Sequence, residues 1–169
     1  MNKILKIATV LTWINMIVWI FVSLIGLLIA LAAGLAGLVV LILPSAVVLH
    51  SYASFQLQKS IRNPAIPLNR QTPTGIRFIG FVALFVGITL LVQGISTVTQ
   101  PHTYLKQWQE IQDQMKMKKS DFVPSTPMVI VAGVFSLLIG LSVAVNVNLN
   151  FRLLRWYYFL RNNSNNSEK

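Results

Sequence analysis

The residues that could do chemistry in the apolar part of this chain are neutral polar side chains. Asn15, His50 and Asn146 each interrupt an apolar stretch, and Asn15 and His50 both lie nine residues from a lysine, Lys6 and Lys59 respectively. At the rise of a helix this spacing is about 13 Å. Asn146 lies six residues before Arg152, which places it slightly nearer the surface. We therefore expect the three polar side chains to lie at a similar depth in the inner half of a membrane.

Further polar residues extend this pattern. Ser54 follows His50 at a four-residue spacing, and Thr89 and Gln93 form a second polar strip in another stretch. Two interpretations are open. Because Asn, Gln and Ser commonly join membrane helices, we favour interhelical hydrogen bonds. The alternative is that the groups line a small cavity or water path, with His50 sensing pH.

Ionisable groups at depth are almost absent, which argues against catalysis. Among residues 7–58, 78–99 and 127–149, His50 is the only acidic or basic side chain, and the chain has no Cys. Proton relays, ion-coupled pumps and intramembrane hydrolases need ionisable groups there. His50 and His102 are expected on opposite sides of the membrane, so they cannot share a metal or haem. With no metal-ligand, phosphate-loop or nucleophile motif, we expect no enzyme, cofactor or metal site.

The composition sets the class of protein. Charged residues make up 11% of the 169 residues and hydrophobic residues 54%, whereas a soluble domain has about 25% charged residues. Residues 7–58, 78–105 and 122–151 contain no Asp, Glu, Lys or Arg. This pattern excludes a soluble enzyme and a disordered chain, and the lack of Cys excludes a disulfide-stapled module. It indicates an integral membrane protein.

The lengths of these stretches set the number of spans. A helix needs about 20 apolar residues to cross the bilayer core, so the two shorter stretches each hold one span. The longest must fold back, which the small residues at 30–37 permit. We predict an all-α integral membrane protein, a single membrane domain over 1–169, with four transmembrane helices in an up-down bundle. The expected spans are 7–29, 36–57, 77–99 and 127–149.

A cleaved signal peptide is the alternative for the first span. The apolar stretch Ile7–Ile29 is longer than the roughly 7–15 residues of a signal-peptide core, and it carries Trp13, Asn15 and Trp19. These features favour a retained span.

The basic residues next to the spans predict the orientation. Ten basic residues are expected on one side of the membrane. The other side has four, and nearby acidic residues partly balance their charge. The ten are Lys3, Lys6, Lys59, Arg62, Arg70, Arg77, Arg152, Arg155, Arg161 and Lys169. We expect both termini in the cytoplasm, a bacterial inner or plasma membrane, and attraction to the bilayer's anionic lipids. Because the basic residues are spread over three short segments, nucleic acid is not an expected partner.

Three segments are expected outside the membrane. Residues 58–76 form a basic, Pro-rich cytoplasmic loop that should be an extended link. Residues 150–169 should form an interfacial anchor followed by a disordered polar tail. Residues 100–126 form the outer loop.

The outer loop is predicted to contain a short amphipathic helix. Leu105, Trp108, Ile111 and Met115 recur at helical spacing among polar residues, which is typical of one apolar stripe. We favour a helix that lies on the membrane or caps its own bundle over a docking face for a partner.

Small residues mark the helix-packing faces. Ser136, Gly140 and Ala144 recur every four residues in one expected span, and Ala83 and Gly87 do so in another. Such spacing lets helix backbones approach closely. Packing within one chain is the simpler expectation, but packing against a second copy is left open.

These features together predict a function class, and we identify no family from them. We expect a non-catalytic, small multi-pass membrane protein that acts as a structural, assembly or accessory component, with a homo-oligomer or a membrane protein as partner. The alternative is a transporter or channel for a neutral or weakly polar solute, which needs a continuous polar cavity.

Overall fold

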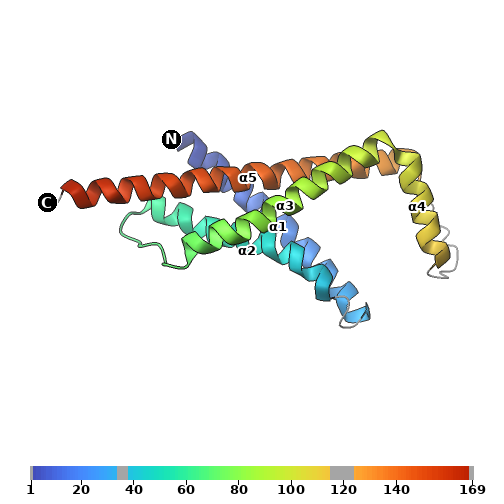
Figure 1. Cartoon of the computed structure of the whole chain (residues 1–169), viewed down its shortest axis with the longest axis horizontal. Helices are drawn as coiled ribbons and strands as arrows, with labels where there is room; N and C mark the ends of the chain where they lie inside the picture. The colour runs from blue at the N-terminus through green and yellow to red at the C-terminus, as the bar shows by residue number, and fades with distance from the viewer. Residues whose placement is uncertain (1, 34–37, 115–123, 168–169) are drawn as a thin grey trace. The chain divides into compact units, whose positions relative to one another are not determined.

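The protein is all-helical over the residues that its computed structural model describes, which are 2–33, 38–114 and 124–167 (Figure 1). The five helices are α1 (Asn2–Ala33), α2 (Leu38–Arg62), α3 (Thr72–Thr99), α4 (Pro101–Gln114) and α5 (Thr126–Ser167).

Three of these helices are long and apolar enough to cross a membrane. The apolar segments are Lys3–Leu28 in α1, Thr72–Thr99 in α3 and Thr126–Arg161 in α5. In α2 the apolar start gives way to a polar second half that contains His50 and Gln58. Over its described residues the chain is therefore all-helical, with the long apolar helices of a multi-pass membrane protein.

The connection between α2 and α3 is shorter than the predicted loop. α3 begins at Thr72, where Pro73 can occupy the first turn without losing a helical hydrogen bond. The intervening residues are also anchored. Leu68 is buried, and its backbone N–H donates to the hydroxyl of Tyr157 on α5 at 3.4 Å. The connection between α2 and α3 thus contacts α5 at Leu68.

α5 extends well beyond the expected span. It continues to Ser167, through the segment predicted as an interfacial anchor and into the tail predicted to be disordered. The sequence offers a reason, because no Pro or Gly follows Gly140 to end the helix.

The chain divides into two compact units. One comprises Met1–Val86 and Ser142–Lys169, and we call it the hairpin unit; the other comprises Gly87–Leu141, and we call it the elbow unit. Each unit contains part of α3 and part of α5, and each is described separately below.

In the hairpin unit, α1 and α2 pack side by side in opposite directions (Figure 1). Trp13 and Phe55 meet edge to face across this contact, with ring centroids 5.5 Å apart. The Nη2 atom of Arg62 donates to the hydroxyl of Thr9 at 2.7 Å, so the end of α2 lies beside the start of α1. The buried apolar cluster of this unit consists of Ala8, Leu57, Leu68, Ile76, Leu153 and Leu154.

In the elbow unit, glycines bring α3 and α5 together. A Cβ atom added to Gly140 would lie 2.8 Å from the carbonyl oxygen of Gly87, and one added to Gly94 would lie 2.9 Å from that of Gly133. Side chains at these positions would force the backbones apart. The seven-residue spacing between glycines on each helix keeps them on one face over two turns.

The helix α4, which lies wholly in the elbow unit, leaves the end of α3 at a sharp angle (Figure 1). The change of direction coincides with Pro101, which disfavours helical geometry in the residue before it. On α4, Leu105 is half-buried and Trp108 is 38% exposed. Met115 of the predicted apolar stripe lies outside the described residues, as does most of the connection to α5.

Candidate functional site

The strongest polar constellation in the described residues is a four-residue network in the hairpin unit. Its members come from three helices: Thr12 on α1, Gln58 on α2, and Asn146 and Asn150 on α5. None of the four is more than 2% exposed. We call these residues the polar network.

Hydrogen bonds connect the four side chains in a closed circuit. The Thr12 hydroxyl donates to Asn146 Oδ1 at 2.9 Å, and Gln58 Nε2 donates both to Thr12 Oγ1 at 3.0 Å and to Asn150 Oδ1 at 2.9 Å. Asn150 Nδ2 completes the circuit by donating to Asn146 Oδ1 at 2.9 Å and to the Asn146 carbonyl oxygen at 2.8 Å. The circuit therefore joins α1, α2 and α5.

Asn15 forms a second link between α1 and α5, one turn along α1 from Thr12. Its Nδ2 atom donates to the carbonyl oxygen of Leu11 at 2.9 Å and to that of Ser142 at 3.3 Å. The Ser142 hydroxyl in turn donates to Asn15 Oδ1 at 3.4 Å. The predicted residues Asn15 and Asn146 thus lie at successive levels of one contact between two helices.

The chemistry of the polar network is limited by its functional groups. Amides and a threonine hydroxyl do not ionise near neutral pH, and they act as hydrogen-bond donors and acceptors. In an apolar environment an amide without a partner is costly, at about 2–7 kcal/mol depending on the reference state. The arrangement is suited to holding three helices in register.

His50 belongs to a separate environment. Its Nε2 atom lies 3.3 Å from the hydroxyl of Ser54, one turn along α2. The imidazole also meets the ring of Phe151 edge to face, with centroids 6.4 Å apart, and its Cε1 atom would be 3.0 Å from a Cβ atom on Gly80. The histidine therefore faces α3 and Phe151 instead of joining the polar network.

Helix geometry explains why His50 and Gln58 have different neighbours. They are eight residues apart, and at 3.6 residues per turn their side chains point about 80° apart around the axis of α2. Gln58 consequently reaches α1 and α5 while His50 faces α3. The predicted grouping of His50 with Asn15 and Asn146 rests on depth in the membrane, which does not specify the direction of a side chain around its helix axis.

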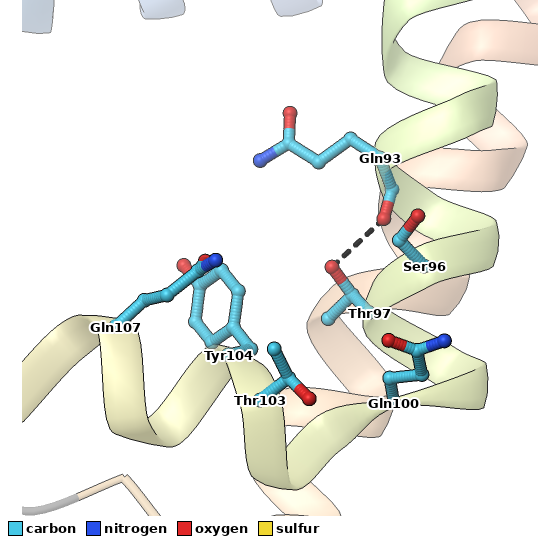
Figure 2. Close-up of a pocket in the computed structure, with 7 residues that line it drawn as sticks. All are labelled: Gln93, Ser96, Thr97, Gln100, Thr103, Tyr104 and Gln107. Atoms are coloured by element: carbon cyan, nitrogen blue, oxygen red, sulfur yellow. Dashed lines mark hydrogen bonds between the residues drawn. The ribbon is translucent and has the colours of Figure 1, made fainter.

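The two predicted residues on the outer part of α3 lie in the elbow unit. Thr89 is exposed. Gln93 lines a hollow of about 310 Å³ between α3 and α4 (Figure 2). The structure therefore places the predicted polar residues in two units, with Asn15, His50, Ser54 and Asn146 in one and Thr89 and Gln93 in the other.

The predicted packing residues are likewise divided. In the elbow unit Gly87 lies against Gly140, and the Ser136 hydroxyl donates to the carbonyl oxygen of Leu90 at 3.0 Å. In the hairpin unit Ala83 is fully buried and Ala144 is half-buried. In the elbow unit, these small residues therefore allow α3 and α5 of the same chain to pack together.

Two kinds of residue lie outside the set predicted from the sequence. Gln58 belongs to the polar network, and its signal is that His50, Ser54 and Gln58 recur every four residues on α2. Gly133 belongs to the glycine contact, and it precedes Gly140 by the same seven residues that separate Gly87 from Gly94. A periodic spacing that continues beyond the predicted residues therefore identifies both.

The described residues contain no group of three or more His, Cys, Asp or Glu side chains that could hold a metal ion. Comparison of the chain with protein-family models, with curated proteins and with solved structures found no match.

Proposed function

We propose that the protein is a non-catalytic four-span membrane protein that acts as a structural, assembly or accessory component. We further propose that both termini are cytoplasmic, in a bacterial inner or plasma membrane, and that anionic lipids surround the basic ends of its helices.

The fourth span in this proposal is α2. Two observations support it: the apolar sequence at the start of the helix and its packing along the apolar helix α1. The hydrogen bond from Arg62 to Thr9 brings the basic end of α2 next to the basic start of α1. That proximity is what the positive-inside rule requires of a hairpin whose two ends lie on one side.

A single observation carries the proposed role, namely that the buried amides of the hairpin unit bond to one another across helices. Thr12, Gln58, Asn146 and Asn150 are nearly inaccessible, and each has a partner within the network. Polar groups used in this way strengthen helix association in lipid. These hydrogen bonds favour a structural role of the polar residues over a role in lining a transport path.

Photo-cross-linking in native membranes tests the proposed role. A photoreactive residue at Trp108 on the apolar stripe of α4 should give a discrete cross-linked product, either a second copy or one defined membrane protein. The matched control is the same residue at Gln109, the next position along the helix, which is exposed and polar. Recovery of only the monomer from both positions, at native expression, would count against an assembly role.

A transporter for a neutral solute is the second candidate, and two atoms on α2 favour it. Ser51 Oγ and Gln58 Oε1 are buried without a hydrogen-bond partner among the described residues. Such atoms could receive water or a polar solute. If reconstituted protein conducts a solute, and His50→Ala and Asn146→Leu abolish the flux while folding is kept, the scaffold proposal fails.

The orientation has a separate test. The tail contains two Asn-X-Ser sequences, Asn162-Asn163-Ser164 and Asn165-Asn166-Ser167, which are glycosylated only where they face a glycosylating lumen. Expressed in a eukaryotic host, a cytoplasmic tail stays unmodified. A mass increase that a glycosidase removes would reverse the proposed orientation.

A further inference from the structure

The angle between α3 and α4 in the elbow unit holds a polar hollow that the proposed scaffold role does not use. Its volume is about 310 Å³, near the lower end of the roughly 300–1,000 Å³ of ligand sites. Figure 2 shows Gln93 projecting from α3 into this space, and Tyr104 and Gln107 projecting into it from α4. The complete lining is Gln93, Ser96, Thr97, Gln100, Thr103, Tyr104 and Gln107.

Every side chain in this lining is polar and uncharged. The three glutamines each offer an amide that donates and accepts, and the Ser, Thr and Tyr hydroxyls do both as well. A site without charge cannot select its ligand by ion pairing. It selects a neutral molecule that presents several donors and acceptors close together.

The side-chain amides of the lining are not occupied by hydrogen bonds within it. The Thr97 hydroxyl donates to the Gln93 carbonyl oxygen at 2.8 Å, and Thr97 is 7% exposed, so this residue forms part of the floor. The amides of Gln93, Gln100 and Gln107 have no hydrogen-bond partner within the part of the chain that the structure describes. Three amides are therefore available to a ligand.

The position of the hollow also requires a polar occupant. Gln93 and Ser96 are exposed on α3 inside the apolar segment Thr72–Thr99. An amide that faced hydrocarbon there would lack any partner, which is unfavourable. Water or a polar ligand must fill this part of the elbow unit.

We infer that the hollow between α3 and α4 binds a neutral saccharide. A sugar ring presents adjacent hydroxyls that donate and accept, matching the amides and hydroxyls of the lining. Tyr104 adds an aromatic face against which the apolar face of a sugar ring can pack. The sugar has two sources, the headgroup of a glycolipid or a free saccharide, and both present the same chemistry.

This inference goes beyond the proposed scaffold role, and the two can fail separately. All seven lining residues belong to the elbow unit, whereas the polar network belongs to the hairpin unit. A protein that assembles with a partner but binds no sugar would retain the first proposal and lose the second.

Binding is tested with the full chain in phosphatidylcholine nanodiscs, prepared without sugar-based detergent. In one arm the probe is maltose, detected by saturation-transfer difference NMR. In the other arm the discs contain monoglucosyl diacylglycerol, and native mass spectrometry measures how much of it the protein retains. Saturable binding in either arm is the expected result. Retention of the glycolipid without binding of maltose assigns the lipid source, and binding of maltose alone assigns the free sugar.

Two leucine substitutions on α4 form the matched pair. Gln107→Leu removes an amide from the hollow and should weaken sugar binding at least tenfold. Gln109→Leu is the same change on the same helix outside the lining, and should leave binding within twofold. Gln100→Leu, on the other side of the hollow, should repeat the effect of Gln107→Leu. All three variants should keep the circular dichroism spectrum of the native protein.

Two results would overturn the inference. One is the absence of binding to both maltose and the glycolipid by the native chain. The other is binding that Gln107→Leu and Gln109→Leu change equally, because the sugar would then be held elsewhere.

Discussion

The hairpin unit and the elbow unit hold their helices together in different ways. In the hairpin unit the amides of Gln58 and Asn150 bridge neighbouring helices through side-chain hydrogen bonds. In the elbow unit Gly87 and Gly140 let two backbones approach without intervening side chains. Lipid removes the hydrophobic drive between helices, so hydrogen bonding and close packing are the two remaining means of association. The hairpin unit relies on buried side-chain hydrogen bonds, whereas the elbow unit combines close glycine packing with one hydrogen bond from the Ser136 hydroxyl to the Leu90 carbonyl oxygen.

The difference has a consequence for substitutions. A close backbone contact has no freedom to adjust, because the obstructing atoms belong to the helix itself. A side-chain network can lose one bond and still keep others. We therefore expect the glycine contact to be the less tolerant of the two.

The largest effect is expected from Gly140→Ala. The added Cβ atom would lie 2.8 Å from the Gly87 carbonyl oxygen and 3.0 Å from the Leu91 nitrogen, so α3 and α5 must separate at a cost of about 2 kcal/mol in the free energy of unfolding. SDS titration of the protein in mixed micelles, followed by circular dichroism, measures that energy.

The control for this prediction is Gly75→Ala. A Cβ atom there would meet only the Ile79 Cδ1 atom at 4.0 Å, so the change should be neutral or stabilising by about 0.5–1 kcal/mol. Equal destabilisation by both substitutions would show that the glycine contact has no special role.

A smaller effect is expected from Gln58→Leu in the polar network. The substitution removes the donor to Thr12 and Asn150, at a cost of about 1–2 kcal/mol for the unpaired acceptors. Gln56→Leu is the matched control, because Gln56 donates only to the Tyr52 hydroxyl in an exposed position on the same helix. If the two variants unfold at the same SDS fraction, the network does not stabilise the hairpin unit.

A double-mutant cycle isolates one bond of the network. Thr12→Val and Asn146→Leu should show a coupling energy of about 1 kcal/mol, near the upper range for hydrogen bonds between membrane helices. Thr9→Val combined with Asn146→Leu should show none, because the Thr9 hydroxyl bonds to the Leu5 carbonyl oxygen and to Arg62 and has no bond to Asn146. Absence of coupling in the first pair would mean that the Thr12 bond adds nothing.

The smallest effect is expected where the connection between α2 and α3 meets α5. Tyr157→Phe removes the hydroxyl that accepts the Leu68 N–H at 3.4 Å, at a cost of about 0.5 kcal/mol. Tyr158→Phe retains the ring that lies 6.0 Å from the Arg77 guanidinium carbon and should change nothing measurable. A thermal unfolding series distinguishes the two, and an unchanged Tyr157→Phe variant would show that the bond is negligible.

Much of the helical architecture follows from the sequence alone. Uncharged stretches of the required length indicate membrane helices, and Pro73 and Pro101 lie at the starts of α3 and α4. The ends of the helices were harder to predict. Past residue 149 the chain turns from apolar to basic and then polar, which suggests the end of a span but does not stop a helix. α5 accordingly continues to Ser167.

The site could be predicted only in part, for a geometric reason. Spacing along the sequence gives the depth of a side chain, and it directed attention to Asn15 and Asn146. It does not give the rotation of each helix relative to its neighbours. That rotation brings Gln58 to the polar network and turns His50 toward Gly80.

We propose that the buried polar groups of the hairpin unit join helices and do not line a water path. Since the chain has no Cys, single cysteines can be introduced without background and probed with a membrane-impermeant maleimide from both sides. We expect no labelling of Thr12→Cys or Asn146→Cys in folded protein, and labelling of Ser96→Cys in the exposed hollow. Labelling of Thr12→Cys and Asn146→Cys at a rate comparable to Ser96→Cys would contradict it.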